Sequence, residues 1–342
     1  MELPPALRRA VDLALQDVRT DDLARAADAL SARYRAEVCD GRLHMADSLA
    51  ARAYAAARLP ATYAAIRDSF EALGALRASF APETALDVGA GPGSAIWAAA
   101  ERWPSLRAAV LVEAGEAVRA LGKALAEQGL PVHVEWRGED LLGGLPNTAP
   151  ADLVTLAYVL DELPESARGT LVDRLWALTR GALVIVEPGT PAGWRRILAA
   201  RSRLIAAGAH LIAPCPHAAS CPLVAPDWCH FSRRVARSRI HLRAKDAEVP
   251  WEDERYSYLA VGRTSGPRPS GRVIAPPRTA SGRVWLKLCR DDGLAGERLF
   301  SRRDRDAFRL ARRAGWGEAI PAPDEAAGTE GAGKLSPLPK SP

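Results

Sequence analysis

The sequence predicts an α/β fold: a parallel sheet with helices on both faces. Short apolar runs end in, or are followed by, glycine or an acidic residue, as buried strands often are. Between them, apolar residues recur every three or four positions, the period of an amphipathic helix. Strands that alternate with helices in this way pair in parallel, because each crossover helix covers a face of the sheet. The expected strands are 84–91, 107–115, 131–138, 151–160 and 181–189, and the expected helices are 95–103, 116–128 and 167–180.

Residues 1–80 show only the helical period, so we expect an N-terminal helical region there. Apolar positions recur through 5–18, 23–38 and 48–80, and Pro60 interrupts the third stretch. The strand-and-helix core then takes residues 81–190.

After Pro188 the alternation loosens, which indicates a different organisation for residues 191–320. A basic helical pattern precedes a cysteine-rich loop, and two later runs have the composition of strands. A segment rich in Pro, Gly, Ser and Arg lies between these runs and predicts a long loop around a short strand. The helix is expected at 193–208, the strands at 255–263 and 283–289, and the loop at 264–282. Residues 321–342 have the composition of a disordered tail.

Positive charge is concentrated in one part of the chain. Residues 191–313 carry 25 Lys and Arg against 11 Asp and Glu, whereas residues 1–190 carry 19 against 26. A basic surface in 191–313 is therefore expected to contact phosphate, and a solvated arginine surface is the alternative. The chain has 48% hydrophobic and 25% charged residues, as soluble globular proteins do. No apolar run reaches the length of a membrane span, so no membrane partner is expected.

The N-terminus indicates the expected compartment. Acidic residues lie among the basic ones in MELPPALRRAVDLALQDVRTDD, and no apolar core of a secretory signal is present. The same acids argue against a mitochondrial presequence, so a cytoplasmic protein is expected. Thiols stay reduced in that compartment, which makes clustered cysteines candidates for metal ligands or catalysts.

A glycine-rich turn follows the first expected strand in ALDVGAGPGSAIWAA. Gly89, Gly91 and Gly93 allow a tight turn and a close approach of the backbone to a ligand, and the helix that follows presents free N–H groups. The strand ends at Asp87, and the second strand ends at Glu113, placed to accept hydrogen bonds from both ribose hydroxyls of an adenosine cofactor. The G-x-G-x-G spacing differs from the G-x-G-x-x-G of dinucleotide enzymes, which remains the alternative.

This acidic residue and glycine turn resemble the motif of class I S-adenosylmethionine (SAM) methyltransferases, whose sheet is Rossmann-like. The resemblance implies that Asp87 lies near the methionine amino group and that Glu113 binds the ribose. It also implies that Asp140, after the third strand, reaches the adenine amino group, although an acid there is often a helix N-cap.

No catalytic residue can be assigned from the sequence. Asp161 and Glu162 follow the fourth strand and are candidates for acid/base chemistry, but an exposed acidic turn before Pro164 explains them equally well. Methyl transfer requires mainly that the protein position the nucleophile in line with the methyl group, because the sulfonium is already activated.

Four of the five cysteines form a candidate metal-ligand set. Cys215, Cys221 and Cys229 lie in one loop, and Cys289 follows at the end of an expected strand. Zinc sites usually show closer pairs, whereas a [4Fe–4S] cubane needs four thiolates around a larger body. Zinc, with His217 or His230 as ligands, and small buried cysteines remain alternatives.

The motifs C-P-H-x3-C-P-L, D-W-C-H-F-S-x-R, R-Y-S-Y-L, L-C-R and A-R-x-A-G-W-G-E resemble the Rsm-type small-ribosomal-subunit methyltransferase-like family. The likeness extends from about residue 35 to 320 and covers both halves in the same order. It implies a SAM-binding domain, and a [4Fe–4S] cluster on Cys215, Cys221, Cys229 and Cys289 that clasps the C-terminal extension to the sheet. It also implies a role with small-subunit rRNA in ribosome assembly and translation. The family comprises mitochondrial proteins and their bacterial relatives, and without the signs of a presequence a bacterial cytoplasmic member is expected.

Three functions follow as hypotheses. The first is a SAM-dependent methyltransferase of small-subunit rRNA with a structural cluster. The second is a non-catalytic assembly factor that binds SAM and the cluster, and the third is a zinc-containing metabolite methyltransferase. For the first two, an RNA-facing surface is expected from the arginines around the cysteine loop and the helix before it. They are Arg195, Arg196, Arg201, Arg203, Arg233, Arg234, Arg237, Arg239 and Arg243.

Overall fold

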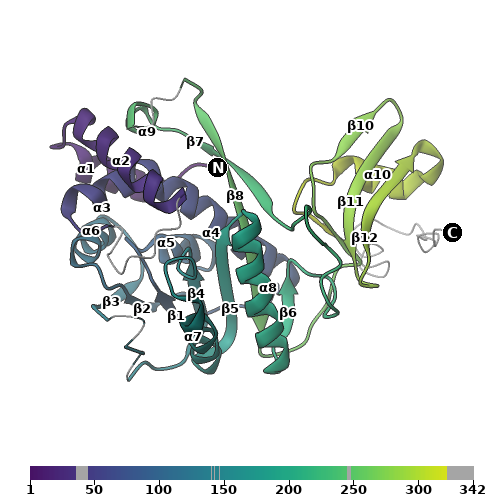
Figure 1. Ribbon diagram of the computed structural model, residues 1–342, viewed down its shortest axis with the longest axis horizontal. Helices are drawn as coiled ribbons and strands as arrows, with labels where there is room; N and C mark the ends of the chain where they lie inside the picture. The colour runs from purple at the N-terminus through teal and green to yellow at the C-terminus, as the bar shows by residue number, and fades with distance from the viewer. Residues whose placement is uncertain (36–44, 140, 142, 146, 245–247, 322–342) are drawn as a thin grey trace.

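The structure is a computed structural model that describes residues 1–35, 45–139, 141, 143–145, 147–244 and 248–321. The predicted adenine contact Asp140 and the predicted tail beyond residue 321 lie outside the described residues. Figure 1 shows a large body of helices around a sheet and a smaller, mostly β body that contains the C-terminal strands.

The large sheet has eight strands in the order β3-β2-β1-β4-β5-β8-β6, and β7 pairs with the outer part of β8. Strands β1 to β5 are parallel, and β8 runs antiparallel to β5, β6 and β7. The predicted Rossmann-like α/β sheet of class I SAM-dependent methyltransferases is therefore confirmed, with β8 as one reversed strand beside the last; a metal that clasps the C-terminal extension stays a prediction. The strands are β1 (Thr84–Val88), β2 (Ala108–Val112), β3 (His133–Arg137), β4 (Ala151–Ala157), β5 (Thr179–Pro188), β6 (His210–Ala213), β7 (Phe231–Ala236) and β8 (Trp251–Gly262).

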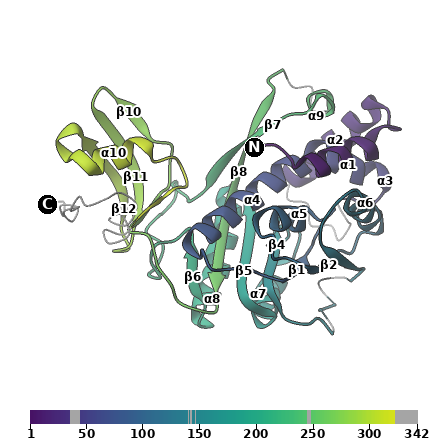
Figure 2. The ribbon, with the colours of Figure 1, turned by 180° about the vertical axis from the view of Figure 1, so that it is seen from behind.

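Helices cover both faces of this sheet, which explains why β4 and β5 are apolar along almost their full length. Figure 1 shows α7 and α8 in front of the sheet, and Figure 2 shows α4 crossing the opposite face. One face carries α1 (Pro5–Leu15), α2 (Thr20–Arg35), α3 (Ser48–Ala57), α4 (Leu59–Leu76), α5 (Ser94–Arg102) and α6 (Glu116–Glu127), and the other carries α7 (Glu165–Ala177) and α8 (Pro191–Ala206).

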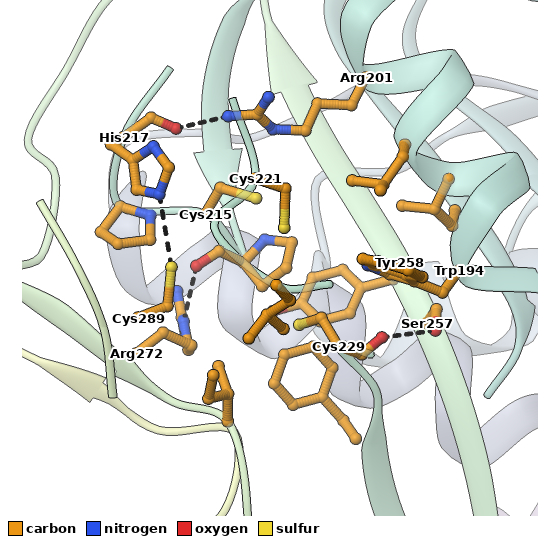
Figure 3. A pocket seen from close by; sticks show the side chains of 17 residues that line it. Trp194, Arg201, Cys215, His217, Cys221, Cys229, Ser257, Tyr258, Arg272 and Cys289 are labelled. Carbon is orange, nitrogen blue, oxygen red and sulfur yellow. Dashed lines mark hydrogen bonds between the residues drawn. The ribbon is translucent and has the colours of Figure 1, made fainter. Parts of the chain in front are cut away.

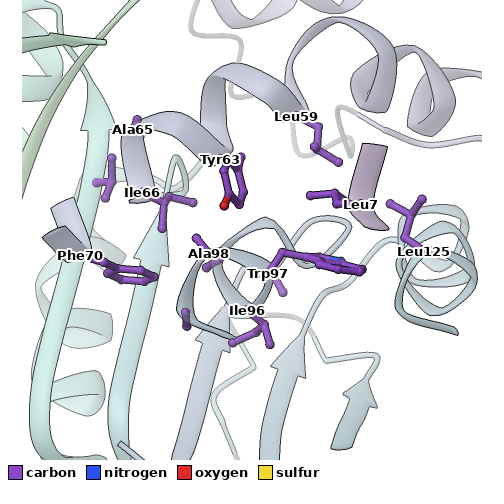
Figure 4. Packing of buried hydrophobic residues seen from close by; sticks show 14 of the residues in the cluster. Leu7, Leu59, Tyr63, Ala65, Ile66, Phe70, Ile96, Trp97, Ala98 and Leu125 are labelled. Carbon is purple, nitrogen blue, oxygen red and sulfur yellow. The ribbon is translucent and has the colours of Figure 1, made fainter. Parts of the chain in front are cut away.

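The N-terminal helices belong to the same hydrophobic core as the sheet. Figure 4 shows Tyr63 and Phe70 of α4 packed toward α5, which contributes Ile96 and Trp97. Alanines fill α3, and their small side chains let neighbouring helices approach closely. Complete burial of an aromatic or large aliphatic side chain contributes roughly 1.5–3 kcal/mol, so this packing fixes the helices over the sheet.

A second sheet of five strands forms the smaller body. On β11, Val284, Leu286 and Leu288 point into a separate core that α10 closes, whereas Trp285 and Cys289 alternate to the other face. The elements are β9 (Gly271–Val273), β10 (Arg278–Ala280), β11 (Arg283–Arg290), β12 (Ala295–Ser301), the 3-10 turn η1 (Arg302–Asp304), α10 (Arg305–Arg313) and β13 (Ala319–Ile320). The stretch expected as a loop at 264–282 therefore contains β9 and β10.

The segment between the two bodies contributes more to the large sheet than the sequence predicts. Strands β6, β7 and β8 all come from the expected cysteine-rich extension, and a short helix α9 (Arg239–Ala244) lies between β7 and β8. Of these three strands, only β8 was predicted, as the strand at 255–263. Over the residues described, none of the helices has the length and apolarity that crossing a membrane requires.

Candidate functional site

The glycine turn lies at the carboxyl edge of β1, where α5 begins. Gly89, Gly91 and Gly93 all adopt positive φ angles, +68°, +53° and +89°, which favour glycine. A Cβ on Gly89 would lie 2.3 Å from Val159, whereas one on Gly91 would meet nothing within 4 Å. Gly89 is therefore required by packing, and Gly91 leaves an open face against which a ligand can lie.

Glu113 follows β2 and faces this turn. One carboxylate oxygen accepts a hydrogen bond from the Gly91 N–H at 2.9 Å, and the other accepts one from the Gly115 N–H at 2.8 Å. Burial raises the pKa of Glu113, while these two N–H groups and Arg119 act against that rise. Each oxygen retains a second lone pair, so the carboxylate can still accept hydrogen bonds from two vicinal hydroxyls.

Asp87 is 2% exposed and has one unsatisfied oxygen. Its Oδ1 accepts a hydrogen bond from Thr155 at 2.6 Å, but its Oδ2 is buried and has no partner among the described residues. Burial raises the pKa of Asp87 to about 7, against the hydrogen bond from Thr155, and repulsion by Glu113 adds to the rise. A buried oxygen of this kind fits a bound ammonium group or water. The residues present thus suit the amino-acid end of SAM beside Asp87 and its ribose beside Glu113.

Tyr158, directly after β4, is a site residue that the sequence analysis missed. It adopts φ +58°, which is unfavourable for a non-glycine residue. Its N–H donates to Val186 at 2.8 Å, and its hydroxyl donates to Glu254 of β8 at 2.9 Å. The apolar run continues past the strand end, which concealed that Tyr158 lies at the ligand-binding edge of the sheet.

The two acidic residues after β4 differ in their surroundings. Asp161 is buried and Glu162 is exposed, so the predicted exposed turn applies to only one of them. Glu187, at the end of β5, is fully buried and bonded to Arg196 at 2.6 Å and to the Leu160 N–H at 3.1 Å. Burial raises the pKa of Glu187, and Asp161 adds to the rise against the attraction of Arg196. The structure brings these acids to the strand ends, but it assigns no catalytic group.

The four predicted cysteine ligands line one pocket. Figure 3 shows Cys215, Cys221 and Cys229 on the loop that connects β6 to β7, with Cys289 reaching the same pocket from β11. The cavity has a volume of about 30 Å³ and lies between α8 and β8 of the large body and β9 and β11 of the small one. Cysteines that are up to 74 residues apart in sequence thus meet where the two bodies join.

The thiols are close enough to affect one another. Burial raises the pKa of Cys229 well above its usual value, and the negative charges that Cys215, Cys221 and Cys289 would carry raise it further. Burial also raises the pKa of Cys289 to about 12, with smaller contributions from Cys215 and Cys221. All of these sulfurs therefore need a cationic centre if they are to be thiolates together.

Nitrogen donors surround the sulfurs. Arg201 donates to the carbonyls of His217 and Ala219, each at 2.8 Å, and Arg272 donates to the carbonyl of Pro214 at 2.9 Å. His217 Nε2 lies 3.4 Å from the sulfur of Cys289. Arg201 Nε, Arg272 Nη2 and His217 Nδ1 are buried without a hydrogen-bond partner in the described part of the chain. Two buried guanidinium groups and spare N–H donors suit an anionic centre with several sulfur acceptors.

The structure also bears on the zinc alternative. Among the residues that the structure describes, no three His, Cys, Asp or Glu side chains converge as ligands of a single metal ion. Of the two histidines considered as zinc ligands, His217 borders the pocket, whereas His230 stacks on Trp228 with ring centroids 4.9 Å apart.

The arginines predicted to face RNA are largely occupied by partners within the chain. Arg233 pairs with Asp68 at 3.4 Å, Arg234 with Asp253 at 2.9 Å and Arg237 with Glu252 at 3.2 Å. In α8, Arg196 is buried against Glu187, Arg201 is buried in the cysteine pocket, and Arg203 pairs with Asp173. Much of the charge in this segment is therefore paired within the chain, which the sequence could not reveal.

Comparisons with known proteins identify relatives of the chain. A family model described as "Mitochondrial small ribosomal subunit Rsm22" matches residues 48–321. The human protein "Ribosome assembly protein METTL17, mitochondrial" is 32% identical over 295 residues, which cover 78% of this chain and 62% of that protein. The chain thus spans less than two thirds of this relative's length.

Methyltransferases are also similar to the chain. "Trans-aconitate 2-methyltransferase" of Azoarcus sp. (strain BH72) is 36% identical over 227 residues, which cover 56% of this chain and 83% of that protein. Among solved structures, an O-methyltransferase family protein from Burkholderia thailandensis aligns with a TM-score of 0.43 and 15% identity over 69% of each chain. Since the family model matches most of the chain, this protein belongs to the Rsm22 family of the mitochondrial small ribosomal subunit, as its motifs predicted.

Proposed function

We propose that this protein is a SAM-dependent methyltransferase of small-subunit rRNA that acts during ribosome assembly. The observation that carries the proposal is the cradle at the edge of β1 and β2, where a buried carboxylate oxygen of Asp87 has no partner among the described residues and the glycine turn is open. The family of the chain, and a relative named for ribosome assembly, support the small ribosomal subunit as partner.

In this proposal the cradle binds and orients the methyl donor, which supplies an activated sulfonium. Asp87 holds the amino group, Glu113 holds the ribose, and Gly91 lets the backbone lie against the cofactor. Tyr158 is fixed at the same edge by two hydrogen bonds and is suited to limit which acceptor can enter. Positioning of this kind accounts for much of the rate enhancement in a transfer from an activated donor.

We further propose a [4Fe–4S] cluster on Cys215, Cys221, Cys229 and Cys289. The four thiols that line one pocket and the buried guanidinium groups beside them support this proposal, and zinc on the same thiols is the alternative. Because Cys289 belongs to the second sheet, the cluster would hold the two bodies together.

Calorimetric titration with SAM tests the cradle. Glu113→Ala should weaken SAM binding, whereas Glu116→Ala, an exposed change three residues later, should leave it unchanged. Thermal unfolding of both variants separates loss of the ligand from loss of the fold. Equal SAM affinity for Glu113→Ala and the wild type would contradict the proposal that the cradle binds SAM.

Methyl transfer is tested with labelled SAM and small ribosomal subunits from a deletion strain. Incorporation of label into rRNA is expected. SAM binding without incorporation would instead favour the second function, an assembly factor in which SAM is structural.

Anaerobic purification tests the cluster. Iron and sulfide in equal amounts, with a visible charge-transfer band, are expected in the wild type and in Thr279→Ser, an exposed control on β10. Cys289→Ser should lose the band or shift its paramagnetic-resonance signal. A colourless wild type with stoichiometric zinc would defeat the cluster and favour the third function.

A further inference from the structure

A group of exposed arginines lies on and beside α10. We name it the α10 surface: it consists of Arg302, Arg303, Arg305, Arg309, Arg312 and Arg313, and all six are exposed. It lies on the small body, on a different element from the arginines that the sequence analysis proposed for RNA.

Helix geometry gathers this charge on one side. At 100° per residue, Arg305, Arg309, Arg312 and Arg313 fall within about 100° of the helix circumference. Phe308 and Ala311 lie outside this arc and are buried against the second sheet. The arginines therefore face away from the protein over a helix roughly 13 Å long.

Acidic residues do little to neutralise the α10 surface. Asp306 pairs with Arg309, and Asp304 accepts hydrogen bonds from Ser301 as a helix cap. For the remaining five arginines the structure, within its described residues, gives no acidic partner. This differs from Arg233, Arg234 and Arg237, each of which is paired with a carboxylate of the same chain.

Helix stability explains only part of this charge. Arg312 and Arg313 lie at the C-terminus of α10, where the helix dipole favours cations. Arg302, Arg303 and Arg305 lie at the N-terminal end, where the dipole disfavours them, and neighbouring like charges repel one another. A function outside the fold is the better explanation for the N-terminal three.

The chemistry of the α10 surface favours RNA phosphate over an acidic protein. Guanidinium groups bind phosphate oxygens in pairs, and arginine is the usual residue for this contact. Protein interfaces need an apolar centre, but the exposed apolar residue on α10 is Leu310 alone, 40% exposed. We propose that the α10 surface binds the phosphate backbone of rRNA, an inference that rests on the proposed partnership with the small subunit.

The test measures binding of the full-length holoprotein to deproteinised small-subunit rRNA between 50 and 200 mM salt. The variant Arg303→Gln/Arg312→Gln/Arg313→Gln should bind more weakly than the wild type. The slope of its log binding constant against log salt concentration should become less steep by about 2 to 3, since each lost phosphate contact reduces the steepness by about 0.7–0.9. The matched control removes three exposed positive charges elsewhere, at Arg9, Arg19 and Lys123. It should keep the slope of the wild type.

A second variant separates charge from folding. Arg303→Lys/Arg312→Lys/Arg313→Lys retains the charge and should retain most of the slope. Unchanged binding by the glutamine variant, with normal binding by the wild type, would overturn the α10 surface and leave the proposed function standing. No rRNA binding by the wild type would overturn both. A defect with assembled subunits but not with naked rRNA would assign the surface to a protein partner.

Discussion

Replacing Asp87 by asparagine tests whether the cradle is built for a cationic ligand at the expense of the free protein's stability. The pKa of Asp87 rises from 3.8 to about 7 because its carboxylate is buried. Below pH 4 the carboxyl group is protonated in both the folded and the unfolded chain and contributes no pH dependence. As the pH rises toward 7, the unfolded chain loses the proton first, so the folded state becomes progressively less stable relative to it.

The size of this effect follows from the two pKa values, which differ by about 3. Each pKa unit corresponds to about 1.4 kcal/mol, so at pH 8 the charged Asp87 costs at most about 4 kcal/mol of unfolding free energy. Asparagine has nearly the same shape, carries no charge and can still accept the hydrogen bond from Thr155. Asp87→Asn should therefore stabilise the SAM-free protein at pH 8 and stabilise it by less than half as much at pH 5, which lies only about one unit above the unfolded pKa.

Urea unfolding of the wild type and Asp87→Asn at pH 5 and pH 8, without SAM, measures this difference. The same variant should bind SAM about tenfold more weakly or worse, because it loses a hydrogen bond between charged groups. Asp152→Asn is the opposite control: burial alone would raise the pKa of Asp152, but hydrogen bonds from Thr84 and Glu83 hold it below its usual value. A stability gain from Asp87→Asn that is equal at pH 5 and pH 8 would refute the reasoning.

Three further predictions concern the turn, a buried ion pair and the metal. Gly91→Ala should lower the free energy of unfolding by only about 1 kcal/mol, through its positive φ, because the added Cβ meets nothing within 4 Å, but it should reduce SAM affinity. Gly89→Ala should destabilise the protein more, because its Cβ would lie 2.3 Å from Val159. Calorimetric titration with SAM and thermal unfolding distinguish the two variants. Arg196→Met should cost about 1–3 kcal/mol at pH 8 in urea unfolding, because it leaves the buried Glu187 without its hydrogen-bond and cationic partner; full stability would contradict this. For the proposed cluster, iron removal under anaerobic conditions should make residues 263–321 sensitive to protease while the large sheet stays resistant; uniform resistance would contradict a structural role for such a cluster.

The parallel part of the large sheet could be predicted because its signals are local. Each strand from β1 to β5 is a short apolar run, and the glycine turn after β1 has a spacing that demands positive φ. The approach of Cys289 to the loop cysteines came from a family resemblance, since no local pattern joins residues so far apart. The shared pocket agrees with it.

The features that could not be predicted from the sequence depend on contacts between distant residues. The pairing of Arg233 with Asp68 and of Tyr158 with Glu254 joins residues that are remote in sequence, so neither charge nor periodicity predicts them. Likewise, β9 and β10 have three residues each, too few to show an alternating pattern, and only pairing with β11 makes them strands.

The late position of β8 in the chain has a consequence for synthesis. In the described structure β6 pairs only with β8, and β5 has β8 as its second neighbour. A nascent chain that ends before residue 262 therefore leaves the apolar edge of β5 without its partner, and such edges recruit other strands. We expect insertion of β8 to be the slow step of folding and truncated chains to aggregate, because β5 and β6 gain their shared partner strand only after residue 262 has been made.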